Sequence, residues 1–96
     1  MITAQTAQPM NYRKKFLIQE YNRLFDEYLD TLDKIVIWKR KVNYEVDYHA
    51  KQNKRDIVKV MIETRNSISR KLYYYDTAIT APDNMTDVYL KIIDTI

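Results

Sequence analysis

The sequence predicts an all-α fold, a long helical hairpin that carries a short third helix. The first observation is that the 96 residues include no glycine, and the second is that no proline occurs between Pro9 and Pro82. Because these residues usually end helices, the long stretch between the two prolines lacks the ordinary helix breakers. The third observation is that apolar residues recur at helical spacing through most of that stretch.

Residues 1–10 are a polar stretch of mainly Thr, Gln and Ala without an apolar core, and basic residues follow it. This order is the reverse of a secretory signal, in which the basic residues come first. We expect residues 1–10 to form a disordered arm and residues 11–96 to form one helical domain. The expected location is intracellular, in the cytoplasm, or in a host cell or virion if the protein is viral.

The first helix is expected at about residues 12–51. Apolar residues recur from Leu17 to Val46 at a mean step close to 3.6 residues, which indicates one buried face. A second apolar stripe runs beside the first and consists of Ile18, Phe25, Leu29, Leu32 and Val36. Since this stripe stops at Val36, the first half of the helix needs two neighbours and the second half needs one.

A polar stretch at residues 50–56 predicts a turn near Asn53 and a second helix at about 55–80. One continuous helix is the alternative, because the two apolar patterns stay nearly in phase through Asn53. The sequence Thr80-Ala81-Pro82-Asp83 ends the second helix and begins a third at about 83–95. The last two helices together match the length of the first, so we expect the third against the first half of helix one. The result is a three-helix bundle at one end and a two-helix arm at the other.

Charge is distributed unevenly along these elements. Residues 20–33 carry five acidic residues and one arginine, whereas residues 34–71 carry eleven basic and four acidic residues, a local net charge of +7. The arm is therefore predicted to be basic. The expected surface for a partner or nucleic acid consists of Lys39, Arg40, Lys41, Tyr44, Tyr48, Lys51, Lys54, Arg55 and Lys59. The alternative is that these charges only keep exposed helix faces in water.

The second stripe and the run Tyr73-Tyr74-Tyr75 predict a dimer or larger assembly, because one short third helix cannot cover so much apolar surface. Tyrosine is also enriched at protein interfaces. The expected oligomer interface consists of Ile18, Phe25, Leu29, Val36, Tyr73 and Tyr74. By contrast, Tyr21, Tyr28 and Tyr75 lie on core stripes and are expected to pack inside the domain.

No catalytic residue, cofactor or metal site is indicated. The absence of cysteine excludes thiolate catalysis and cysteine-bound zinc, and the absence of glycine excludes phosphate-binding loops and nucleophile elbows. The single histidine, His49, is expected on the seam between the helices as a structural residue. No apolar run approaches the roughly 18 residues that span a bilayer. We therefore expect neither a membrane partner nor a small-molecule substrate.

Together these observations predict a non-catalytic interaction or assembly protein that self-associates or docks on a larger protein. The compact helical chain without a chemical motif favours an accessory protein of a virus or mobile element. The alternative function is a nucleic-acid-binding module that uses the basic helical arm.

Overall fold

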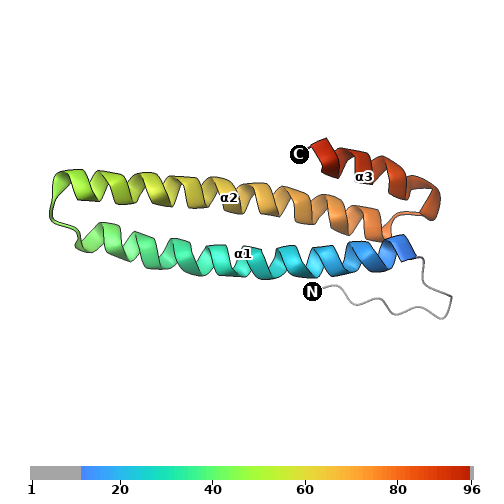
Figure 1. The fold of residues 1–96 in the computed structure, drawn as a ribbon, viewed down its shortest axis with the longest axis horizontal. Helices are drawn as coiled ribbons and strands as arrows, with labels where there is room; N and C mark the ends of the chain where they lie inside the picture. Colours follow the sequence, from blue (N-terminus) through green and yellow to red (C-terminus); the bar gives the residue numbers. More distant parts are fainter. Residues whose placement is uncertain (1–11, 96) are drawn as a thin grey trace.

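The computed structural model describes residues 12–95, so the arm expected at residues 1–10 lies outside the described residues. The elements are α1 (Tyr12–Tyr44), α2 (Tyr48–Thr80), the short 3-10 helix η1 (Asp83–Met85) and α3 (Thr86–Thr95). α1 and α2 form a long antiparallel hairpin, and α3 folds back along α2 (Figure 1). The predicted fold class is confirmed, and the continuous helix is excluded because the chain reverses after Tyr44.

The turn of the hairpin lies at Glu45–Asp47, so the predicted turn near Asn53 is wrong. Asp47 has an extended backbone and caps α2, since its side chain accepts a hydrogen bond of 2.8 Å from the backbone N–H of Ala50. The expected helices at about 12–51 and 55–80 therefore become two helices of 33 residues each. Asn53 lies inside α2, and Val46, expected in the core of helix one, lies in the turn.

The core lies between α1 and α2 in the half of the hairpin away from the turn. Leu24, Ile68 and Leu72 form its centre, and Tyr21, Phe25, Tyr28 and Tyr75 pack against them partly buried. The tyrosines predicted to be core residues are thus confirmed in that role. Farther along the hairpin, Ile35 and Val58 continue the buried line toward the turn.

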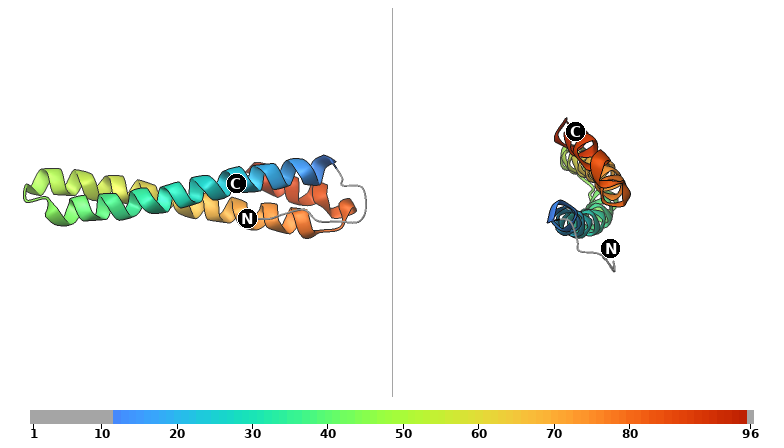
Figure 2. Two further views of the ribbon diagram at one scale, coloured as in Figure 1. Left: turned by 90° about the horizontal axis from the view of Figure 1, so that it is seen from below. Right: turned by 90° about the vertical axis from the view of Figure 1, so that its right-hand side faces the viewer.

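α3 packs along α2, and α2 lies between the other two helices in Figure 1. The Cα atoms extend over 59 × 25 × 13 Å, so the helices form a flat layer; Figure 2 shows α1 and α2 crossing at a shallow angle. The prediction that the third helix lies against the first half of helix one is therefore wrong. α3 packs mainly on α2 and meets α1 near its first turn, where Arg13 pairs with Asp87. Ala78 of α2 is completely buried, and its small side chain lets a neighbouring helix approach α2 closely.

Two extended residues, Ala81 and Pro82, carry the chain from α2 into η1. The first turn of α1 holds this corner: the Lys14 ammonium donates to the carbonyl of Ala81 (2.6 Å) and pairs with Asp83 (3.2 Å). Arg13 pairs with Asp87 of α3 at 2.5 Å. Neither connection needs a left-handed residue, since no positive φ occurs in residues 12–95.

Candidate binding surface at the tip of the hairpin

The hairpin tip consists of the turn Glu45–Asp47 and the adjoining helix ends, residues 37–44 and 48–59. The backbone N–H of Glu45 donates to the carbonyl of Val42 (3.3 Å), which closes the last turn of α1. The carboxylate of Glu45 accepts from the Lys54 ammonium and from the backbone N–H of Asp47 (3.2 Å). These bonds fix the short turn, and together with the cap of Asp47 they hold the two helix ends beside each other.

Three large side chains in or beside the turn are strongly exposed. Val46 is 98% exposed, Tyr44 84% and Tyr48 73%. Tyr44 and Tyr48 were predicted as part of the binding surface, and both are exposed. They lie on different helices that flank the turn, whereas the helix expected at about 12–51 would have carried both. The prediction that His49 lies on the buried seam is wrong, since His49 is exposed. Its ring packs edge-on against the ring of Tyr48, with 5.6 Å between the two ring centres.

The basic residues of the tip differ in what they contact. The Lys41 ammonium lies 4.3 Å from the centre of the Trp38 ring, and Lys54 is paired with Glu45. Five further cations have no ion-pair partner among residues 12–95: Lys39, Arg40, Lys51, Arg55 and Lys59. The tip therefore keeps a positive surface that its own carboxylates do not neutralise.

Two open hollows bring some of these residues together. The larger, about 420 Å³, is lined by Ile37, Arg40, Lys41, Tyr44, Glu45 and Lys54. The smaller, about 250 Å³, lies between the helices and is lined by Lys39, Val42, Asn43, Arg55 and Val58. Four predicted site residues thus share the first hollow and two share the second, whereas Tyr48, Lys51 and Lys59 line neither of these two.

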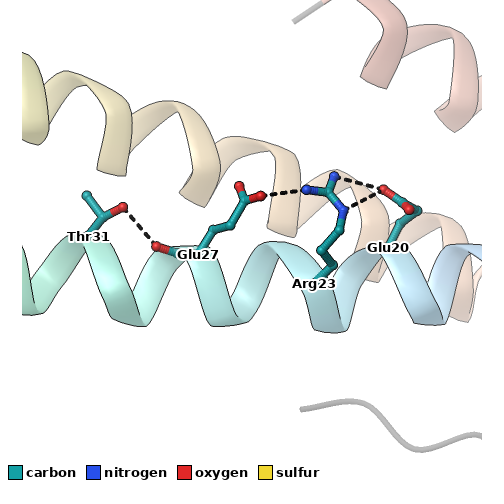
Figure 3. Close-up of polar contacts among 4 residues, drawn as sticks. All are labelled: Glu20, Arg23, Glu27 and Thr31. Atoms are coloured by element: carbon teal, nitrogen blue, oxygen red, sulfur yellow. Dashed lines mark hydrogen bonds and ion pairs between the residues drawn. The ribbon is translucent and has the colours of Figure 1, made fainter.

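The acidic stretch at residues 20–33 is partly neutralised within α1, unlike the tip. Arg23 bridges Glu20 (2.9 Å) and Glu27 (2.5 Å), and the Thr31 hydroxyl donates to the Glu27 carbonyl (Figure 3). The hydrogen bond to Glu20 raises the pKa of the Arg23 guanidinium above its ordinary value. Lys34 pairs with Asp30 at 2.9 Å. The unpaired positive charge is thus concentrated at the tip, whereas the acidic stretch lies in the middle of α1.

The residues predicted for an oligomer interface divide into two groups. Ile18, Phe25 and Tyr74 are half-buried within the molecule, and the Phe25 ring lies 6.2 Å from that of Tyr21. Leu29, Val36 and Tyr73 are exposed and free for a partner. Ile37, which no prediction named, is also exposed; the available signal was its place off the buried line of Leu17, Leu24 and Ile35 at helical spacing.

Within residues 12–95 no group of three or more His, Asp or Glu side chains could hold a metal ion, and none of the helices described is long and apolar enough to cross a membrane. Comparison with family models, curated proteins and solved structures finds no match to this chain.

Proposed function

We propose that this chain is a non-catalytic interaction protein that docks on a larger protein through the tip of its hairpin. The observation that supports the proposal is the exposure of Val46 and Tyr48 at the tip. Exposed apolar groups of this size gain free energy when a partner removes them from water, at about 25 cal/mol per Å² of apolar area. Aromatic residues and arginine are also the residue types enriched at protein interfaces.

The charges of the tip favour an acidic partner surface. Lys51 and Arg55 lie on the first turns of α2 and have no ion-pair partner among the described residues. Complementary charge would speed the encounter and orient it, while Val46 and Tyr48 would supply the buried contact. The short, hydrogen-bonded turn holds these side chains ready for binding, which lowers the entropic cost of docking.

A test of docking uses the double variant Val46→Asp and Tyr48→Ser as bait for partner capture from the native host. The matched control replaces two exposed apolar residues at the opposite end, Phe16→Ser and Val88→Ser. Proteins retained by the wild type and by the control, but lost with the tip variant, support the proposal. Equal capture by all three baits would overturn it.

Nucleic-acid binding is a second candidate function, favoured by the unpaired cations at the tip. Contacts with phosphates release counterions, so log K should fall with log salt at a slope of about −0.7 to −0.9 for each phosphate contacted. The test is fluorescence anisotropy with single-stranded DNA at several salt concentrations. The double variant Lys51→Glu/Arg55→Glu is measured in the same way and should lose affinity for the DNA. If the wild type binds DNA only weakly and the variant binds equally well, nucleic-acid binding is excluded.

A further inference from the structure

The outer face of α1, turned away from α2, carries an uncovered apolar stripe near the tip. Leu29 is 46% exposed, Val36 and Ile37 are each 50% exposed, and Tyr44 is 84% exposed. Asp33 and Arg40 lie between them on the same face. At 3.6 residues per turn, these two residues lie about 150° round α1 from the buried line of Leu17, Leu24 and Ile35.

The two charged residues of this stripe have no ion-pair partner within residues 12–95. Some other charges of α1 are paired, since Lys34 holds Asp30 and Arg23 holds Glu20 and Glu27. An occupant that covers the apolar stripe would thus meet one free carboxylate and one free guanidinium. The best-fitting occupant carries a base and an acid in the reverse order.

The spacing of the stripe is symmetric. Its positions, 29, 33, 36, 37, 40 and 44, are mirrored about the midpoint between Val36 and Ile37. If two copies of α1 pack antiparallel about that midpoint, Leu29 of one copy lies opposite Tyr44 of the other. Asp33 of each copy then lies opposite Arg40 of the other, so that two equivalent ion pairs flank an apolar centre.

We infer that a second copy of this chain docks on this face and forms an antiparallel two-fold dimer centred on Val36 and Ile37. The inference goes beyond the tip-docking function and does not depend on it. Charge selects this register: a shift by one heptad either way places Asp33 opposite Asp33, or Arg40 opposite Arg40. Burial of the apolar stripe drives association, and the ion pairs fix orientation.

The seam between positions 29 and 44 is about 22 Å long at 1.5 Å per residue. Each helix contributes four apolar side chains to it, which places the interface at the small end of specific interfaces. We therefore expect a weak dimer in reversible exchange with the monomer. Val46 and Tyr48 lie outside the seam and stay available at the tip.

Charge reversal tests the pairing. Asp33→Arg or Arg40→Asp puts like charges opposite each other at two places, and each should raise the dissociation constant about tenfold or more in sedimentation equilibrium. The double variant Asp33→Arg/Arg40→Asp exchanges the partners and should restore the dimer. Glu63→Arg, an exposed reversal on α2, is the matched control and should leave the dissociation constant unchanged.

A monomeric wild type at high protein concentration would overturn the inference, as would a double variant no tighter than the single ones. A second measurement does not depend on charge. The chain has no cysteine, so a single Ile37→Cys substitution should give a disulfide-linked dimer on mild oxidation. Val60→Cys, on the exposed surface of α2, is the control and should stay monomeric. Equal cross-linking of both variants, or of neither, would refute the antiparallel seam.

Discussion

The carboxylate of Glu45 and the ammonium of Lys54 form an ion pair that spans the turn of the hairpin. Glu45 follows the last residue of α1, whereas Lys54 lies in the second turn of α2. The same carboxylate accepts from the N–H of Asp47, so one side chain secures the turn and the start of α2. The bond from Lys54, helped by that from Asp47, lowers the pKa of Glu45 below its ordinary value of 4.5.

The lowered pKa predicts a pH dependence of stability. A carboxylate with a lower pKa in the folded than in the unfolded protein stabilises the fold above the unfolded pKa. This contribution disappears as the pH falls through the folded pKa. Urea unfolding should show that Glu45→Gln is less stable than the wild type well above pH 4.5, and that the difference shrinks below it. A difference that stays constant with pH would contradict the role given to Glu45.

The position of the turn predicts opposite responses to proline at two sites. Asn53→Pro should cost about 3 kcal/mol or more, because residue 53 lies inside α2 and proline removes a helical hydrogen bond. Val46→Pro should cost clearly less, since Val46 lies between the helices. Unfolding free energies of the two variants provide the comparison. Equal losses would argue against a turn at Glu45–Asp47.

Lys14 should control the docking of α3. Lys14→Met keeps an apolar stem of similar length but removes the ammonium that holds Ala81 and Asp83. Because this side chain is 23% exposed, we expect a modest loss of about 1 kcal/mol. Amide hydrogen exchange in α3 should accelerate. Lys15→Met, a change at an exposed neighbour, is the control and should leave exchange in α3 unaltered.

Replacing Thr86 by valine should stabilise the folded protein. Its side chain is 1% exposed, and its hydroxyl oxygen has no hydrogen-bond partner among the described residues. Thr86→Val keeps the shape and removes the unsatisfied hydroxyl, so it should raise the unfolding free energy by about 1 kcal/mol. Thr64→Val is the control, because the Thr64 hydroxyl is satisfied by the Val60 carbonyl; it should change stability by less than about 0.5 kcal/mol. A loss of stability in Thr86→Val would show that the hydroxyl has a partner after all.

The fold class follows from the sequence, because apolar spacing and missing helix breakers leave few alternatives to a hairpin. The turn lies before the polar residues 50–56, because helix propensity outweighs polarity there. Residues 42–49 belong, apart from Glu45, to the types with lower helix propensity, whereas residues 50–55 are mostly strong helix formers. Asp47 at the end of the weaker stretch was the capping signal.

The candidate surface was predictable in composition but not in arrangement. The basic residues of the arm are exposed or half-buried, as charged side chains usually are, so their charge could be assigned to the surface from sequence. The sequence could not show which of these basic residues has an ion-pair partner. The pair between Lys54 and Glu45, for example, forms only because the chain reverses at residues 45–47. The burial of Ala78 in α2 was likewise hard to predict, because a small residue adds little to an apolar pattern.

The absence of positive φ angles in residues 12–95 bears on how this sequence can change over time. A connection built on a left-handed glycine accepts almost no other residue, because any Cβ at that position introduces strain. Here both connections use backbone conformations open to every ordinary residue. Sequence drift in the turn and the corner should therefore be limited by a few polar groups, above all the Asp47 carboxylate and the Lys14 ammonium. Relatives of this chain could differ at most connecting positions while keeping the hairpin intact.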